Sequence, residues 1–484
     1  MSEPAIDPGT PRRFLASSLA SYWSLGVRLI VGFAAKVVLA RLLIPEEHGL
    51  YELALRIVTI AAAARDLGLI YHLIRDERRP YGTVFGFTVA SGALVTGALV
   101  LGAPLAAGLD PELPGVLRVL ALWVFLDGLT GVPRTFFERE LRIGRLVWPE
   151  IARGLLAAGL AIGLALAGAG VWSFVAADLA AAGLFAALVW YRARGELPLS
   201  FEPALIPGLL RRSSGLFLVW LLYHLVIHVD PFVVRAFEDA AAVGQYVRAY
   251  MLAFLVRQIV FPRALLPALV EYRHDPDRFH AAFRVGTVFL LSCEVVAGYF
   301  LFFNAEKVVE VVLGPQWGPA VLLLKILCFV PFLDVFSELG GDVLKVRHED
   351  RLWLLILGLN LASLVAFGAA FTSRWGPPGM AAANFLLLGN LLMAWRMARI
   401  FARGFPRLLA DMALIYLVPL PLFGAAALLP AASWWRLAAS AAAAAAGMGL
   451  LAWRFWRPVR LFLGGRVAAA GTAGDGGSGA GGPD

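Results

Sequence analysis

The chain has 484 residues, of which 60% are hydrophobic and 16% are charged, and its mean hydropathy is +0.76. A soluble domain is roughly half apolar and a quarter charged, so this composition excludes an ordinary soluble enzyme, a disordered protein and a secreted disulfide-rich scaffold. It indicates an all-α polytopic membrane protein, in which a net charge of +8 is typical of basic loops on one membrane face and not of a nucleic-acid partner.

Apolar segments of about 20 residues, long enough to cross a bilayer as helices, follow one another along almost the whole chain. We predict fourteen spans, at residues 14–40, 48–72, 82–107, 114–134, 146–168, 170–191, 208–234, 243–267, 281–304, 318–345, 352–372, 376–400, 408–430 and 433–456. Pro419 and Pro421 predict a kink in the thirteenth. The first apolar segment is interpreted as a transmembrane helix and not as a cleaved signal peptide.

The basic residues of the loops alternate from one connection to the next. The even-numbered connections and the two termini carry 27 arginines and lysines, whereas the odd-numbered connections carry five. The positive-inside rule therefore predicts that both termini are cytoplasmic. Every predicted connection is short, so we expect no inserted soluble domain, which weighs against a membrane glycosyltransferase or ligase with extramembrane catalytic groups.

A short pattern occurs twice, 195 residues apart. In residues 38–51 and 234–246, a span ends at an arginine and an acidic loop, and Gly-x-Tyr opens the next helix at Gly49 and Gly244. The offset covers six spans, so the two copies share an orientation, and parallel repeats with a site between them are a transporter architecture. We predict a cytoplasmic N-terminal segment at residues 1–13, followed by two parallel six-helix bundles around a central cavity, at residues 14–200 and 201–405. Two extra C-terminal helices at residues 406–460 and a flexible cytoplasmic tail at residues 461–484 complete the chain.

The motifs around this repeat resemble those of a known family. The segments Ala40–Tyr51, Arg65–Leu69, Gly244–Pro267 and Val312–Ala320 are similar to signatures of the polysaccharide flippases, the O-antigen and exopolysaccharide translocases of the multidrug/oligosaccharidyl-lipid/polysaccharide exporter superfamily. The resemblance covers roughly residues 14–405. His48 stands where such proteins usually place an aromatic residue, and Ala268 follows Pro267 where serine or threonine is common. Both departures leave the substrate subtype open.

The resemblance implies a function. Such proteins flip undecaprenyl-diphosphate-linked oligosaccharides from the inner to the outer leaflet of the bacterial cytoplasmic membrane, by alternating access driven by an ion gradient. We therefore expect no enzyme activity and no cofactor beyond H⁺ or Na⁺ as the coupling ion. The implied partners are the lipid-linked oligosaccharide, membrane lipids and the polymerase or ligase of polysaccharide assembly.

Five arginines within predicted spans are candidate ligands of the substrate diphosphate, namely Arg28, Arg56, Arg65, Arg248 and Arg257. Charges inside a membrane are costly and usually functional, and the planar guanidinium binds phosphate bidentately. The alternative is internal pairing, because Glu52 lies one turn from Arg56 and Asp66 adjoins Arg65. A spacing of nine residues is half a helical revolution out of phase, so neither Arg56 and Arg65 nor Arg248 and Arg257 are expected to face one cavity together.

Carboxylates within the predicted spans are candidates for ion coupling, namely Glu294, Asp334, Glu338, Asp127 and Asp178. A carboxylate in a dry cavity can take up a proton or bind sodium. Asp342 is interpreted as a solvated charge beside Lys345. His224 and His228 have the i, i+4 spacing of zinc ligands, but Leu225 replaces the glutamate of the hydrolase motif, and we predict no metal site.

Other functions remain open from the sequence. A cation-coupled drug exporter of the same superfamily would have an acidic and apolar cavity, whereas a peptidoglycan-precursor flippase would differ only in its glycan. A membrane glycosyltransferase or ligase and a non-transporting scaffold of polysaccharide assembly are alternatives from other classes.

Overall fold

The structure is a computed structural model that describes residues 26, 29–70, 73, 79–140, 142–260, 265–402, 404–430 and 433–472, without the side chains of residues 214, 216, 333 and 457–472. The described chain is almost entirely helical and contains no strand, which confirms the predicted all-α fold class. It forms two compact units, which are described separately. Unit 1 comprises Met1–Arg248, Val309–Ala320 and Leu361–Leu386, and unit 2 comprises Ala249–Val308, Val321–Asn360 and Leu387–Asp484. The predicted bundle boundaries stay a prediction.

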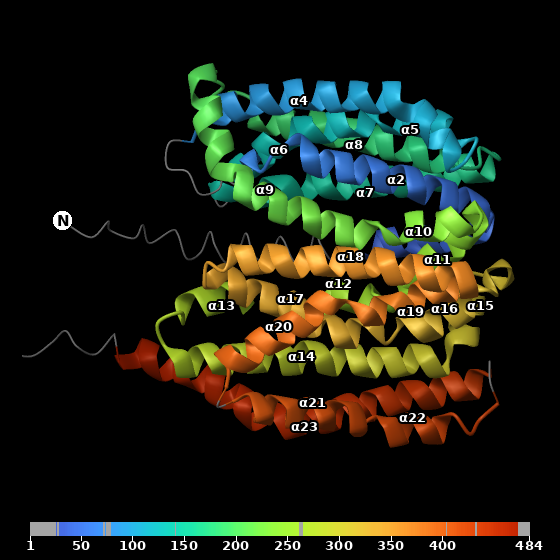
Figure 1. The fold of residues 1–484 in the computed structure, drawn as a ribbon, viewed down its shortest axis with the longest axis vertical. Helices are drawn as coiled ribbons and strands as arrows, with labels where there is room; N and C mark the ends of the chain where they lie inside the picture. Colours follow the sequence, from blue (N-terminus) through green and yellow to red (C-terminus); the bar gives the residue numbers. More distant parts are fainter. Residues whose placement is uncertain are drawn as a thin grey trace, which may run out of the picture. The chain divides into compact units, whose positions relative to one another are not determined.

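Unit 1 begins with a helical segment at residues 29–42. The elements that follow are α2 (Pro45–Arg65), α4 (Tyr81–Gly102), η1 (Ala103–Gly108), α5 (Leu113–Leu120), α6 (Leu122–Arg139), α7 (Gly144–Leu166), α8 (Trp172–Ala193), η2 (Pro203–Leu205), α9 (Ile206–His228), α10 (Asp230–Phe237), the start of α11 (Ala240–Ala253), η3 (Pro315–Trp317), α19 (Pro377–Ala383) and η4 (Asn384–Leu386). Helices α4, α6, α8 and α7 pack against one another in that order (Figure 1).

Unit 2 contains the remaining helices. They are α12 (Leu255–Val260), α13 (Leu265–Glu271), α14 (Pro276–Phe303), α15 (Ala305–Val312), α16 (Ala320–Leu327), α17 (Val330–Val346), α18 (Asp350–Trp375), α20 (Leu388–Ile400), α21 (Phe405–Leu417), α22 (Leu420–Ala426) and α23 (Trp434–Thr472). The boundary between the units divides two of them, so that residues 309–312 of α15 and residues 361–375 of α18 belong to unit 1. Helix α14 packs against α17, α21 and α23, so it occupies the middle of this unit.

Ten helical segments of the described chain are long and apolar enough to cross a membrane. They are Tyr81–Gly108, Leu113–Arg139, Gly144–Leu166, Trp172–Ala193, Pro276–Phe303, Ala320–Val346, Asp350–Trp375, Pro377–Ile400, Phe405–Ala426 and Trp434–Trp456. Each coincides with a predicted span. An eleventh, Pro203–Ser213 with Phe217–His228, is bent by 60° and coincides with the predicted span at 208–234. The chain is thus a multi-pass membrane protein.

Three of the fourteen predicted spans have no counterpart among these eleven segments, so the count of fourteen stays a prediction. The span at 14–40 is described only at residue 26 and from residue 29 onward. The span at 48–72 corresponds to α2, which carries Glu52, Arg56 and Arg65 and is therefore less apolar than the ten segments. The span at 243–267 is divided between α11, α12 and α13. The thirteenth span is interrupted near Pro419, because α21 ends at Leu417 and α22 begins at Leu420, and the predicted kink stays a prediction.

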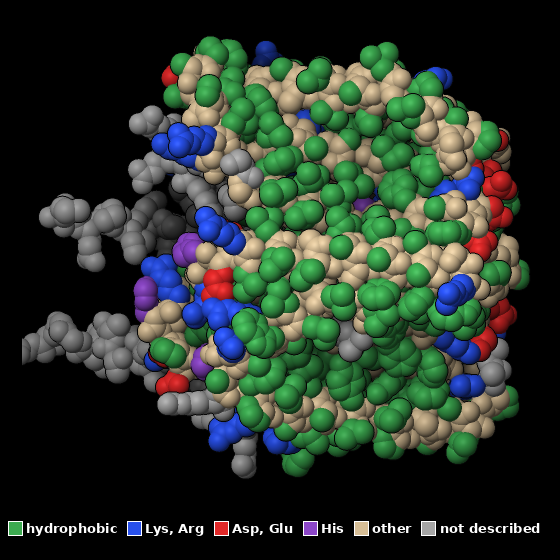
Figure 2. Space-filling view, viewed as in Figure 1, with side chains coloured by type: hydrophobic (Ala, Val, Ile, Leu, Met, Phe, Trp, Pro, Cys, Tyr) green, Lys and Arg blue, Asp and Glu red, His purple; other side chains and the backbone are tan. Residues whose placement is uncertain are grey.

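Large apolar side chains cover the outer faces of the helices, whereas charged side chains gather near the helix ends (Figure 2). On α4 and η1, Leu94, Leu101 and Leu105 are at least three-quarters exposed. Exposed leucines at this density in a soluble protein would form an aggregation-prone patch, but they suit a helix in contact with lipid. The buried interior of unit 1 is also apolar at one end, where Tyr81, Phe137 and their neighbours pack together.

Candidate functional site

The two copies of the sequence repeat contact each other within unit 1. A Cβ atom on Gly49 would lie 1.7 Å from the carbonyl oxygen of Ala240, and a Cβ atom on Gly244 would lie 2.0 Å from the carbonyl oxygen of Pro45. Pro45 and Ala240 are themselves separated by the repeat offset, so the contact is reciprocal. Glycine is required at both positions because a side chain would overlap the backbone of the other helix.

The Val312–Ala320 motif of the resemblance completes this junction. Trp317 Nε1 and Gln316 Nε2 each donate a hydrogen bond of 2.7 Å to the carbonyl oxygen of Ala40. Gln245 Nε2 donates to the carbonyl oxygen of Gln316 at 3.0 Å, and Arg41 donates to the carbonyl oxygen of Val311. The bonds to Ala40 satisfy a carbonyl near the end of the first helical segment, where no partner is available within the helix. The motif residues therefore serve first to hold three chain segments together.

Two of the predicted arginines lie beside this junction in one polar cluster. Arg56 of α2 donates to Nδ1 of His228 and pairs with Glu52 at 3.4 Å. Arg248 of α11 donates to Nδ1 of His48. The Nε of Arg56 is buried and has no hydrogen-bond partner within the described chain. Lys36 interacts electrostatically with both arginines, with Glu52 and with Asp178, so we call these residues the unit 1 cluster.

Asp178, a predicted ion-coupling residue, belongs to the edge of this cluster. It accepts a hydrogen bond from the hydroxyl of Tyr51, the tyrosine of the first repeat. The Tyr51 ring stacks on Phe174 with a centroid distance of 4.5 Å. The repeat tyrosines therefore each hold a carboxylate, because Tyr246 donates to Asp230 at 2.6 Å.

Asp230 is a site residue that the sequence analysis missed. Besides Tyr246, Asn384 Nδ2 contacts Asp230 Oδ2 at 3.3 Å and the hydroxyl of Tyr246 at 3.1 Å. The other oxygen, Oδ1, is buried without a hydrogen-bond partner within the described chain. The signal was available, because Asp230 is an acidic residue inside the predicted span 208–234 and such residues are functional candidates by default.

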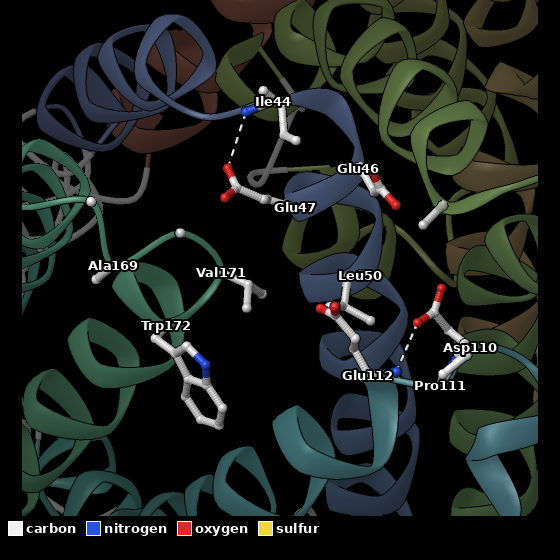
Figure 3. Close-up of a pocket in the computed structure, with 13 residues that line it drawn as sticks. Ile44, Glu46, Glu47, Leu50, Asp110, Pro111, Glu112, Ala169, Val171 and Trp172 are labelled. Atoms are coloured by element: carbon white, nitrogen blue, oxygen red, sulfur yellow. Dashed lines mark hydrogen bonds between the residues drawn. The ribbon is translucent and has the colours of Figure 1, made fainter.

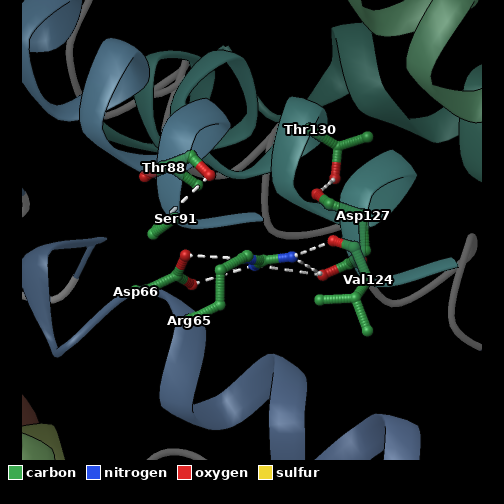
Figure 4. Close-up of polar contacts among 7 residues, drawn as sticks. All are labelled: Arg65, Asp66, Thr88, Ser91, Val124, Asp127 and Thr130. Carbon is green, nitrogen blue, oxygen red and sulfur yellow. Dashed lines mark hydrogen bonds and ion pairs between the residues drawn. The ribbon is translucent and has the colours of Figure 1, made fainter. Parts of the chain in front are cut away.

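Arg65 is held by an internal network between α2 and α6 (Figure 4). Its Nε and Nη2 donate to the two oxygens of Asp66 at 2.8 and 3.0 Å, and Nη1 donates to the carbonyl oxygen of Val124 at 2.6 Å. Asp127 accepts from both Nη atoms at 3.4 Å. A Cβ on Gly128 would lie 3.1 Å from Nη1, so the glycine makes room for the guanidinium. Arg65 and Asp127, predicted for different roles, are thus ion-pair partners.

Arg257 is held in a comparable way in unit 2. Its Nε donates to Glu294 at 2.7 Å, its Nη1 to Asp334 at 2.8 Å and its Nη2 to the carbonyl oxygen of Pro331 at 2.6 Å. Glu338, one turn from Asp334 on α17, also interacts electrostatically with Arg257. The structure therefore brings one predicted diphosphate ligand together with three predicted ion-coupling carboxylates, which we call the unit 2 cluster.

The remaining predicted residues fall elsewhere. Arg28 lies outside the described residues. Asp342 accepts a bond of 2.9 Å from Lys345 as expected, but its carboxylate is buried and not solvated, because α17 turns this face toward its neighbours. His224 contacts the carbonyl oxygen of Trp220 at 2.9 Å. Within the described chain, no group of three His, Cys, Asp or Glu residues is placed to hold a metal ion.

Unit 1 also contains a cavity of about 560 Å³ at the start of α2. Its polar lining is acidic, with Glu46, Glu47, Asp110 and Glu112, and Trp172 lies at one side (Figure 3). Two of these carboxylates accept backbone hydrogen bonds, Glu47 from Ile44 and Asp110 from Glu112. None of the described residues that were predicted to bind substrate is among those that line this cavity.

Together, the apolar helices and the buried charge clusters define a multi-pass membrane protein with charged groups enclosed within its helical units. The sequence profile of the family described as "Polysaccharide biosynthesis protein" matches residues 38–322. The chain belongs to this family, which confirms the resemblance drawn from its motifs.

Curated relatives agree with this assignment. The chain is 26% identical over 362 residues to the succinoglycan biosynthesis transport protein ExoT of Rhizobium meliloti (strain 1021), covering 70% of each chain. It is 22% identical over 343 residues to the lipopolysaccharide biosynthesis protein WzxC of Escherichia coli (strain K12), covering 67% of this chain and 69% of WzxC.

Solved structures show the same fold. The lipid II flippase MurJ in an inward closed conformation superposes with a TM-score of 0.70 at 12% identity, covering 92% of this chain and 99% of MurJ. An inward-facing multidrug resistance MATE transporter of the MOP superfamily gives a TM-score of 0.62 at 16% identity, covering 77% of this chain and 95% of the transporter. The chain therefore has the fold of this superfamily.

Proposed function

We propose that this protein flips an undecaprenyl-diphosphate-linked oligosaccharide from the inner to the outer leaflet of the bacterial cytoplasmic membrane, by alternating access and with both termini cytoplasmic. The observation that carries the proposal is that Arg56 and Arg248 lie together in one buried cluster. The chain that holds them belongs to a polysaccharide biosynthesis family. The relatives named as succinoglycan transport and lipopolysaccharide biosynthesis proteins support this substrate class.

The chemistry favours these two arginines over the others. A diphosphate crossing about 30 Å of hydrocarbon needs cations to replace its hydration. Arg65 and Arg257 are each bound by two carboxylates, which offset the guanidinium charge. Arg56 has one carboxylate partner, Glu52 at 3.4 Å, and keeps a buried Nε without a hydrogen-bond partner in the described chain. We therefore assign the diphosphate to Arg56 and Arg248, with Arg28 as a further candidate ligand.

Ion coupling is assigned to the unit 2 cluster. One guanidinium faces three carboxylates there, and the side chain of Glu294 is 1% exposed. Excess negative charge in a buried site is costly unless a cation arrives. Uptake of H⁺ or Na⁺ by Glu294, Asp334 or Glu338 would remove that excess, and this supports coupling of transport to an ion gradient. Asp127 and Asp178 already have partners in unit 1 and are second candidates.

The proposed protein is a transporter and not an enzyme, so it would supply its product to others. The flipped lipid carries an intact diphosphate, which a polymerase or ligase on the outer leaflet must consume. A cation-coupled drug exporter of the same superfamily is the second candidate, supported by the fold match to the multidrug transporter.

Deletion of the gene in the host bacterium followed by lipid extraction tests the proposal. We expect diphosphate-linked oligosaccharide to accumulate on the cytoplasmic leaflet and surface polymer to disappear. Arg56→Ala and Arg248→Ala should fail to restore the polymer at normal protein levels, whereas Arg194→Ala, on an exposed turn, should restore it. Unchanged lipids and polymer, with new sensitivity to cationic drugs, would instead establish the exporter.

A further inference from the structure

The cavity at the start of α2 has no role in the proposed function. Four segments of unit 1 line it, within residues 44–50, 110–112 and 168–172 and at Ala240. In the predicted order of spans they lie at the first, third, fifth and seventh connections, which are all extracytoplasmic in the proposed topology. The cavity is therefore placed on the side where the glycan of a flipped lipid emerges.

We propose that this cavity is a glycan-binding site, which holds an uncharged sugar of the oligosaccharide against the indole of Trp172 and the carboxylate of Glu112. The identity of the ligand rests on the proposed function, whereas the site itself is separate from the unit 1 cluster. The cavity volume of about 560 Å³ lies within the range of roughly 300–1,000 Å³ that is typical of small-molecule sites.

Trp172 supplies the apolar surface of the site. It is the first residue of α8, its side chain is 44% exposed, and its indole lies at the edge of the cavity (Figure 3). A sugar ring has a face of C–H groups, and the indole offers a broad apolar face and one N–H donor. A tryptophan at the end of a span also suits the membrane interface, so the experiment has to separate the two roles.

Two carboxylates of the lining are held by the fold. Glu47 accepts a hydrogen bond from the backbone of Ile44 at 3.1 Å, and a Cβ on Gly170 would lie 2.6 Å from its Oε1. Asp110 pairs with Arg235 at 3.4 Å. These carboxylates shape the wall, because their positions are fixed by neighbours within unit 1.

Glu112 supplies the acceptor for sugar hydroxyls. Its backbone N–H donates to Asp110 at 3.0 Å, which fixes the turn, whereas the residue itself is exposed. Its side chain extends toward the same open space as the indole of Trp172 (Figure 3). An ionised carboxylate only accepts hydrogen bonds, and charge-assisted bonds of this kind are the stronger ones. A hydroxyl-rich ligand supplies the matching donors.

The lining favours an uncharged sugar over other ligands. Within the described chain, no three of these carboxylates are placed to hold one metal ion. An acidic sugar would be repelled by the four carboxylates. An organic cation would be attracted, but Trp172 is the single aromatic ring among the lining residues. The turn at 168–170 adds backbone groups, and sugar hydroxyls can use both donors and acceptors.

The position of the cavity along α2 predicts a dependence on glycan length. Arg56, assigned to the diphosphate, follows Glu47 by nine residues, which is about 14 Å along a helix. One sugar next to the diphosphate does not span this distance, whereas a short oligosaccharide does. The site should therefore act on lipids with several sugars and not on a lipid with one.

The first experiment compares two glycan lengths on one carrier. Full-length protein in proteoliposomes receives a fluorescent polyprenyl-diphosphate lipid with one glucose or four, and initial flipping rates are measured. Trp172→Ala and Glu112→Gln should each lower the rate for the tetraglucosyl lipid about ten-fold, since a contact to the sugar is lost. The rate for the monoglucosyl lipid should stay nearly unchanged. Trp172→Tyr keeps an aromatic face and should retain most of the tetraglucosyl rate.

Matched controls come from unit 1 outside the cavity. Trp148→Ala removes a tryptophan of α7 that is 59% exposed, and Glu202→Gln neutralises an exposed carboxylate. Both should leave the ratio of the two flipping rates at the wild-type value. If Trp172→Ala fails to fold, the exposed Glu112 gives the same comparison.

The second experiment measures sugar binding without transport. Saturation-transfer NMR on the purified full-length protein in detergent uses cellotetraose, tetragalacturonate and ethidium as probes. Cellotetraose should bind the wild type and lose its signal in Trp172→Ala, whereas tetragalacturonate should not bind. Ethidium should not displace cellotetraose.

The outcomes separate this site from the function on which its ligand rests. Equal losses for both lipids, unchanged rates in the variants, no cellotetraose binding by the wild type, or displacement by ethidium would each overturn the glycan site. The proposed function would stand as long as the wild type flips the lipids. No flipping by the wild type would overturn that function, whereas cellotetraose binding that is lost in Trp172→Ala would still establish the sugar site.

Discussion

Gly49 and Gly244, which occupy equivalent positions in the two repeats, lie against each other's helices so closely that neither has room for a Cβ atom. Each glycine faces the first-turn carbonyl of the opposite repeat. The pair places Arg56 and Arg248 in one cluster, because the first arginine follows Gly49 by about two turns and the second follows Gly244 by about one turn.

Replacing Gly49 or Gly244 with alanine should therefore destabilise the protein. A Cβ atom 1.7 to 2.0 Å from a carbonyl oxygen forces the two helices apart, and overpacking of this kind costs about 1–3 kcal/mol or more. The measurement is the Tm of purified protein in detergent. Gly163→Ala is the control, because nothing lies within 4 Å of a Cβ there and alanine in a helix is favoured by roughly 0.5–1 kcal/mol. Equal Tm changes for all three variants would contradict the close contact.

Loss of the Arg65 guanidinium should be more damaging than loss of an exposed arginine. Arg65→Ala leaves Asp66 and Asp127 without their buried cation, and breaking a buried ion pair costs roughly 3–5 kcal/mol; both carboxylates are partly exposed, which favours the lower end. Arg79→Ala removes an exposed pair with Glu140 and should cost about 1 kcal/mol or less. Thermal unfolding and membrane yield compare the two, and similar losses would argue against the network.

Trp317 and Gln316 should act together at the carbonyl of Ala40. Trp317→Phe and Gln316→Ala each remove one of two donors, at about 1 kcal/mol each for the hydrogen bond. The double variant leaves the carbonyl without either side-chain donor and should lose more than the sum of the two. A double-mutant cycle on Tm measures this coupling, and strict additivity would show that the two bonds are independent.

The pH dependence of stability should include a contribution from Glu349, outside the membrane spans. Arg396 donates two hydrogen bonds to this carboxylate, at 2.5 and 2.7 Å, and holds its pKa below the ordinary value; partial burial acts in the opposite direction, and Arg347 adds to the lowering. A lowered folded-state pKa stabilises the protein above the unfolded pKa of about 4.3, and this stabilisation is lost as pH falls through the folded pKa. The Tm difference between wild type and Glu349→Gln should shrink between about pH 5 and 3. A constant difference would rule out this linkage.

Removing one carboxylate of the unit 2 cluster should weaken the coupling of flipping to an ion gradient without weakening the binding of the diphosphate lipid. Asp334→Asn leaves Arg257 with Glu294 but removes one carboxylate able to take up a cation. We expect flipping in proteoliposomes to lose most of its dependence on an imposed H⁺ or Na⁺ gradient, with the KM for the diphosphate lipid unchanged. Glu306→Gln is the control, because Glu306 lies outside the spans and pairs with Lys325. Full gradient dependence in Asp334→Asn would exclude Asp334 as a coupling residue.

Much of the architecture followed from the sequence alone. Long apolar segments with polar interruptions predict helices because the bilayer leaves no other partner for backbone groups, and ten such segments were found where they were expected. The family could be inferred from motifs such as Gly49-x-Tyr51, because glycine and proline constrain the backbone locally. Pro419 likewise indicated an irregularity in the thirteenth span, where the structure has the break between α21 and α22.

The roles of the charged residues depended on tertiary structure. Helical phase predicts that Arg56 and Arg65 point to opposite sides of α2. It does not indicate that Arg56 contacts His228 or that Arg65 contacts Asp127. Arg257 and the carboxylates of α14 and α17 are far apart in sequence, so their pairing depends on helix packing. His48 and Asp230 gained their significance only from partners about 200 and 16 residues away. Composition and periodicity are local properties and determined the class and family of the protein, whereas the partner of each buried charge is set by contacts between distant helices and was decided by the fold.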